Sequence, residues 1–167
     1  MPEITALGWF HTLIGVLALG SGLYTLCRYK LIRSSTKSGK LYLLCTLVAA
    51  GTALGIYNQG GFGVAHILAI LTLLAVAVGG LAEKKSIVGS LSPHLQAASY
   101  SATFLFHMIP AITDGLMRLP PEDPIVARID DPLLQGFYLA FLVTYVVGLT
   151  LQMLYLRRHS STPTSTA

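Results

Sequence analysis

Charged residues are scarce in this chain: only 11% of its 167 residues are Asp, Glu, Lys or Arg, whereas 53% are hydrophobic. Soluble domains average roughly 25% charged residues, and a soluble fold could not hide so much apolar surface. The net charge of +4 also comes without the solvated basic face that nucleic-acid binding needs. The composition therefore excludes an ordinary soluble domain and a nucleic-acid-binding protein.

Cysteines and familiar catalytic motifs are equally few. Cys27 and Cys45 are the two cysteines, and both lie near helix ends that we expect on the cytoplasmic side, where disulfides rarely persist. We interpret them as free structural thiols. The sequence has no recognisable Ser/His/Asp, phosphate-binding or zinc-protease spacing. An enzyme that acts on a soluble substrate is therefore not expected.

What the chain has instead is long apolar blocks. A bilayer core of roughly 30 Å requires about 20 apolar residues per helical crossing, and five blocks approach this length. They cover residues 6–27, 41–57, 63–82, 95–117 and 133–156. The fourth block is the least apolar, so we expect it to face protein rather than lipid. The sequence thus predicts an all-α, polytopic transmembrane helical bundle of about five helices.

The placement of basic residues predicts the orientation, since Lys and Arg accumulate in cytoplasmic loops. With five spans and the N-terminus outside, only Arg118 and Arg128 of the eleven basic residues lie on the outer side. The others lie in the first loop, the third loop and the tail: Arg28, Lys30, Arg33, Lys37, Lys40, Lys84, Lys85, Arg157 and Arg158. We therefore expect an outer N-terminus and a cytoplasmic C-terminus.

The connections predict a single domain over residues 1–158. The turn at residues 58–62 is so short that the second and third spans must form an antiparallel hairpin. Residues 118–132 contain four prolines and mostly acidic charges, and we expect them to cap the outer face. Residues 159–167 are polar and low in complexity, which predicts a disordered tail.

Ionisable residues inside the spans are the candidate functional residues, because a charge in the hydrocarbon core is costly and is usually retained for function. The candidates are His11, His66, His107 and Asp114, with the hydroxyl of Tyr57 and the amide of Asn58 nearby. At a rise of ~1.5 Å per residue, His11 and His66 lie at matching depths below the outer surface, and His107 lies deeper. His107 and Asp114 are seven residues apart and share one helix face.

Two neutral imidazoles on facing helices can hold a b-type haem from both sides. The matching depths make His11 and His66 the preferred pair, and His107 with either of them is the second choice. A divalent metal held by His11, His66 and Asp114 competes for the same groups. A haem held by this pair would make the protein an electron carrier, and we expect a membrane-bound or quinone redox partner. An interfacial role for each histidine, bonded to headgroups or to a backbone carbonyl, is the alternative in which no cofactor binds.

A non-redox membrane protein is the alternative function. His107 and Asp114, on a polar helix that Pro110 loosens, could line the path of a small-solute or ion carrier. An accessory membrane subunit without a cofactor is the remaining possibility. The lipid bilayer is the partner common to all of these functions, and the sequence leaves the oligomeric state open.

Three short motifs resemble those of the DUF2306 family, a group of bacterial polytopic membrane proteins of unknown function. The first is Trp9-Phe10-His11 at the start of the first span. The second is the basic stretch at residues 37–42, which leads to a glycine and an aromatic residue, and the third is the histidine-led stretch at residues 93–100. The resemblance covers residues 9–118. It implies a multi-pass protein of the bacterial inner (cytoplasmic) membrane.

Overall fold

The computed structural model describes residues 4–57 and 61–160. Within these residues the chain forms five α-helices, one short 3-10 turn and no strand. The elements are α1 (Ala6–Tyr29), α2 (Lys37–Ala53), α3 (Val64–Lys85), η1 (Gly89–Leu91), α4 (Ser92–Arg118) and α5 (Pro132–Ser160). The prediction of an all-α bundle of about five helices is confirmed. The disordered tail was predicted to begin at residue 159, but α5 continues through Ser160, and the rest of the predicted tail, residues 161–167, lies outside the described residues.

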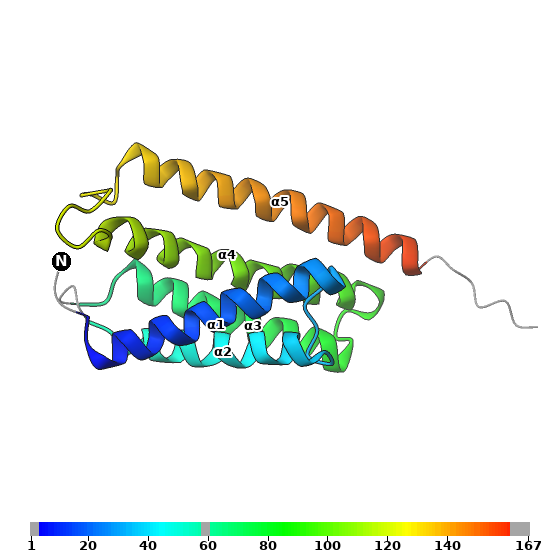
Figure 1. Cartoon of the computed structure of the whole chain (residues 1–167). Helices are drawn as coiled ribbons and strands as arrows, with labels where there is room; N and C mark the ends of the chain where they lie inside the picture. The colour runs from blue at the N-terminus through cyan, green and yellow to red at the C-terminus, as the bar shows by residue number, and fades with distance from the viewer. Residues whose placement is uncertain (1–3, 58–60, 161–167) are drawn as a thin grey trace, which may run out of the picture.

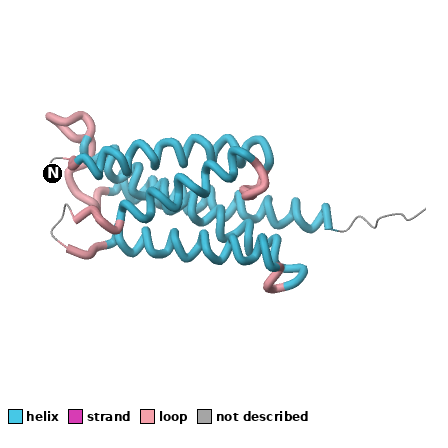
Figure 2. The backbone as a smooth tube through the Cα atoms, turned by 90° about the horizontal axis from the view of Figure 1, so that it is seen from below, coloured by secondary structure: helices cyan, strands magenta, loops and turns pink. Residues whose placement is uncertain are grey.

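Helices α1 to α4 form an up-and-down four-helix arrangement, and α5 lies along its side (Figure 1). Helix α1 packs against α2, α2 against α3 and α3 against α4, while α4 also touches α1 and so closes the arrangement. Helix α5 packs against α4. Figure 2 shows the loops gathered at the two ends of these helices. Helices α2 and α4 are therefore diagonal partners, and their facing side chains meet at the centre of the bundle.

The two ends of the bundle differ in charge. One end holds the α1–α2 connection, η1 and the C-terminal end of α5 (Figure 1). We call it the basic end, because it carries Arg28, Lys30, Arg33, Lys37, Lys40, Lys84, Lys85, Arg157 and Arg158. The opposite end holds the connection from α4 to α5. We call it the acidic end, because it carries Asp114, Glu122, Asp123, Asp130 and Asp131.

Helix α2 is displaced along the chain from the apolar block that predicted it. The Thr36 hydroxyl accepts a hydrogen bond from the Gly39 N–H at 3.1 Å, so the helix begins at Lys37 rather than at residue 41. Such a side-chain cap satisfies a backbone donor that the first helical turn leaves unpaired. At the other end α2 stops at Ala53. Tyr57 therefore lies in the connection to α3 and not in the helix.

Among the described helices, α1, α3 and α5 are long and apolar enough to cross a membrane. Their outward faces keep large apolar side chains exposed, including Leu13, Leu74 and Leu151. An aqueous protein would bury such side chains, whereas lipid tails cover them at no cost. Helix α2 has 17 residues, and α4 carries a row of polar side chains. This arrangement fits an integral membrane protein.

Candidate functional site

A line of hydrogen-bonded side chains runs through the centre of the bundle between α2 and α4. The Tyr42 hydroxyl lies 2.6 Å from the Thr103 hydroxyl, and both residues are 0% exposed. One turn along α2, the Thr46 hydroxyl lies 3.1 Å from Nε2 of His107 and also interacts with the Tyr42 hydroxyl. Thr103 donates to the backbone carbonyl of Tyr100 at 2.7 Å. We call these five residues the central line.

The carbonyl at one end determines the direction of the two hydrogen bonds nearest to it in the central line. A carbonyl only accepts, so the Thr103 hydroxyl uses its hydrogen there and the Tyr42 hydroxyl donates to Thr103. The Thr46 hydroxyl can either donate to Nε2 of His107 or accept from it, so the direction of this bond depends on the His107 tautomer.

His11 reaches the same side of α2 from α1. Its Nδ1 lies 3.0 Å from the Ala49 carbonyl and 3.2 Å from the Thr52 hydroxyl. Since the carbonyl only accepts, Nδ1 carries the hydrogen and Nε2 keeps its lone pair. His11 also interacts electrostatically with His107 and with Asp114. Two imidazoles from different helices are thus gathered on one side of α2.

Asp114 lies on the His107 face of α4, toward the acidic end. Its carboxylate is 64% exposed and forms an ion pair with Nε of Arg118 at 3.5 Å. A cavity of about 490 Å³ lies beside Asp114, bounded by α4 and the loop that follows it. At the rim of this cavity Arg128 donates two hydrogen bonds to Asp130, at 2.9 and 2.8 Å, and these lower the pKa of the Asp130 carboxyl.

Glu83 lies at the basic end, near the C-terminus of α3. The Tyr100 hydroxyl donates to its Oε2 at 3.0 Å, and the Ser34 N–H donates to its Oε1 at 2.9 Å. The Tyr100 ring lies against Gly79, one turn before Glu83, where an added Cβ would overlap the ring. Tyr100 therefore joins α3 to the central line, with its hydroxyl at Glu83 and its carbonyl at Thr103.

His66 lies apart from the central line, in the first turn of α3. Its Nδ1 accepts a hydrogen bond from the Gly63 N–H at 3.2 Å, and its ring centroid lies 4.7 Å from that of Tyr57 and 5.0 Å from that of Phe62. The residue is 4% exposed, and within the described residues its Nε2 has no hydrogen-bond partner. Because Nδ1 accepts, neutral His66 carries its hydrogen on Nε2.

The predicted site residues thus fall into two groups. His11 and His107 both bond to groups of α2, whereas His66 lies with Tyr57 at the start of α3. Asn58 is outside the described residues. The described part of the chain holds no cluster of three or more His, Cys, Asp or Glu side chains that could bind a metal. The haem pair and the metal site stay predictions.

We did not predict from the sequence that Tyr42, Thr46, Thr52 and Thr103 belong to this arrangement. A signal was present, because residues 42, 46, 49 and 52 recur at helical spacing on one face of an apolar segment. On α4, Thr103 is one turn before His107 on the same face. Hydroxyl residues in apolar helices can bond to their own backbone, so this spacing alone does not distinguish a cross-helix bond from a local one.

Comparisons with family models, with curated proteins and with solved structures give no match for this chain. The resemblance to the DUF2306 family stays a prediction.

Proposed function

We propose that this integral membrane protein carries an ion, that the ion is a proton, and that His107 and His11 bind it inside the bundle. The observation that carries the proposal is the central line, in which the His107 imidazole is bonded to the Thr46 hydroxyl, one turn along α2 from the buried pair of Tyr42 and Thr103 hydroxyls. Chains of Asp, Glu and His inside membrane bundles mark proton paths. Asp114, beside its cavity at the acidic end, is the group that collects the proton.

Each step conserves protons. The incoming proton binds Nδ1 of His107, which becomes an imidazolium, and Nε2 then passes its own proton to the Thr46 hydroxyl. Thr46, Tyr42 and Thr103 each accept one proton and release one, so that no group keeps a net charge. The Tyr100 carbonyl that accepts from Thr103 has no proton to release, so water must carry the proton from Thr103 to Glu83. Imidazole suits this role because one ring nitrogen can bind a proton while the other releases one. Glu83, held by the Tyr100 hydroxyl, is the carboxylate at the basic end.

The charge difference between the ends supports an orientation. Lys and Arg accumulate on the cytoplasmic side of membranes, and the basic end carries nine of the eleven basic residues. We propose that the basic end faces the cytoplasm and that the acidic end faces outward. The family resemblance further suggests the cytoplasmic membrane of a bacterium. Protons would then enter beside Asp114.

Proton flux into liposomes tests the proposal. The purified protein is reconstituted with a pH-sensitive dye inside the vesicles, and a potassium diffusion potential drives proton entry. We expect flux in the wild type and a loss of about tenfold, equivalent to ~1.4 kcal/mol in barrier height, in His107→Gln and in Tyr42→Phe. Glutamine can still bond to Thr46 but cannot bind the proton. Thr150→Val is the matched control, since Thr150 bonds only its own helix in α5, at the Val146 carbonyl.

Two results would overturn the proposal. Wild-type vesicles that acidify no faster than empty vesicles would remove the carrier function. Equal flux in wild type, His107→Gln and Tyr42→Phe, with all three proteins folded by circular dichroism, would show that the central line only holds helices together.

Haem b binding with electron transfer is the second candidate. His11 favours it, because an imidazole that donates its Nδ1–H to a carbonyl presents the Nε2 lone pair in the manner of metal-bound histidines. His66 would first have to release the Gly63 N–H. A Soret band in protein from haem-replete cells, lost in His66→Ala and kept in His94→Ala, would support haem. A colourless preparation would support the carrier.

A further inference from the structure

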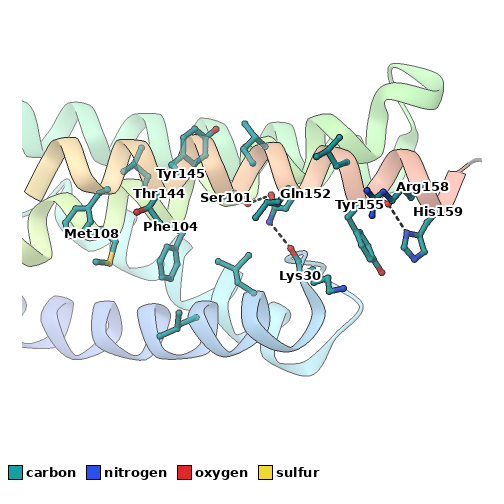
Figure 3. A pocket seen from close by; sticks show the side chains of 18 residues that line it. Lys30, Ser101, Phe104, Met108, Thr144, Tyr145, Gln152, Tyr155, Arg158 and His159 are labelled. Atoms are coloured by element: carbon teal, nitrogen blue, oxygen red, sulfur yellow. Dashed lines mark hydrogen bonds between the residues drawn. The ribbon is translucent and has the colours of Figure 1, made fainter.

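A groove of about 1000 Å³ lies between α1, α4 and α5, on the far side of α4 from α3 (Figure 3). Its walls are mostly apolar and include Leu23, Phe104, Met108, Phe141 and Leu149. The groove is not lined by any of the candidate histidines, His11, His66 and His107. The groove is therefore separate from the central line, and it has the size of pockets that hold small molecules.

A polar bridge crosses the groove and ties α5 to its neighbours. Gln152 of α5 donates from Nε2 to the Lys30 carbonyl at 2.8 Å, and its Oε1 accepts from the Ser101 hydroxyl at 2.9 Å. Toward the acidic end, Gly148 lines the groove, and a Cβ added to it would meet no atom within 4 Å. Helix α5 thus meets α1 at the bridge and leaves open space beside Gly148.

Positive charge gathers at one end of the groove. Lys30 and Arg158 line it at the basic end, whereas Phe104 and Met108 lie toward the other end (Figure 3). The Lys30 ammonium lies 4.9 Å from the ring centroid of Tyr155. A long apolar channel with cations at one end matches a molecule that has a hydrocarbon chain and an anionic head.

We propose that this groove binds one anionic phospholipid, with its phosphate at Lys30 and Arg158 and an acyl chain beside Phe104 and Gly148. Basic pockets between transmembrane helices bind anionic headgroups, and the long stems of Lys and Arg keep their charges at the headgroup level. The phospholipid enters from the bilayer, because α5 is one of the helices apolar enough to cross it.

The positive charge at the basic end of the groove favours an anionic phospholipid over three other possible occupants. A second copy of the chain in the same orientation would bring its own basic end against Lys30 and Arg158, and like charges at close range repel. A zwitterionic lipid such as phosphatidylcholine carries its own ammonium group beside the phosphate, so it would offset less of the positive charge of Lys30 and Arg158. A soluble anion would leave the apolar walls unfilled.

Native mass spectrometry of lipid retained by the protein tests the headgroup. The full chain is reconstituted in vesicles of equal parts phosphatidylcholine and phosphatidylglycerol and then extracted in mild detergent. We expect the retained lipid to be enriched in phosphatidylglycerol, and the enrichment to fall to the vesicle ratio in the double variant Lys30→Gln with Arg158→Gln. Lys84→Gln with Lys85→Gln removes the same charge at the same end, outside the groove, and should keep the enrichment.

A second pair of variants tests the acyl-chain site. Gly148→Leu fills the open part of the groove and should lower the amount of retained lipid of both types. Gly136→Leu is its control, since Gly136 is also in α5 with no atom near an added Cβ, and it does not line the groove. Equal retention in these two variants would overturn the proposal. The proposal would also be overturned if the two charge variants lost the enrichment equally, or if the retained lipid showed no headgroup preference. A dimer mass in place of a lipid adduct would overturn it as well.

Discussion

The Tyr42 hydroxyl in α2 meets the Thr103 hydroxyl in α4 at 2.6 Å, and both side chains are fully buried. This contact joins the diagonal helices of the four-helix arrangement through its centre. The bond also sets the register of α2 against α4, because His107 reaches Thr46 one turn further along each helix. The same contact therefore contributes to both stability and the proposed proton path.

A double-mutant cycle should detect this contact as a coupling energy. Tyr42→Phe and Thr103→Val each remove one hydroxyl, and hydrogen bonds between membrane helices couple by ~0.6 kcal/mol on average and up to ~1.7 kcal/mol. We expect a coupling energy close to ~1.7 kcal/mol, because both hydroxyl groups are fully buried. The free energy of unfolding in detergent gives the measurement. Strict additivity of the two substitutions would contradict a direct bond.

Gly79→Ala should loosen the packing of α3 against α4. The Tyr100 ring occupies the space where the new methyl group would lie, and overpacking of this kind costs ~1–3 kcal/mol. The shift should also weaken the bond from the Tyr100 hydroxyl to Glu83. Gly80→Ala is the matched control, with its nearest contact at 3.7 Å. If thermal unfolding gives the same midpoint for both variants, the ring does not lie on Gly79.

The pair formed by Arg128 and Asp130 should show a defined pH dependence. The two hydrogen bonds from Arg128 lower the pKa of Asp130, so the stabilisation is present above the unfolded pKa, ordinarily ~3.9, and is lost as the pH falls through the folded value. NMR titration of the Asp130 carboxyl carbon should give a midpoint below the ordinary value. Arg128→Gln should raise it, and Arg118→Gln should not. An unchanged midpoint in Arg128→Gln would refute the pairing.

Topology follows from the charge difference between the ends. A reporter fused after Ala167 should read cytoplasmic, and one inserted at Glu122, in the connection from α4 to α5, should read external. The reason is that translocating the basic end would move nine Lys and Arg side chains across the membrane. An external signal from the C-terminal fusion would remove the orientation and reverse the direction of the proposed proton path.

The central line shows why the candidate site was only partly predictable. His107 and Asp114 could be assigned to one face of α4 because their spacing of seven residues is a property of any helix. That His107 bonds to Thr46 depends on which helices are diagonal, and hydropathy carries no information about neighbours. The same limit applies to His11 and His66, whose matching depths did not show that His11 turns to α2 while His66 bonds to Gly63 at the start of its own helix.

The sequence by itself determined that this is an all-α chain of five helices, three of which, α1, α3 and α5, are long and apolar enough to cross a membrane, because helix length and hydropathy are local properties of each segment. Helix α2 begins before the apolar block that predicted it, because the Thr36 hydroxyl caps the helix at that point. Only the tertiary structure decided that α2 and α4 face each other across the centre and that α5 meets α1 at Gln152, leaving a groove. These features depend on packing between distant residues, which the order of side chains along one helix does not encode.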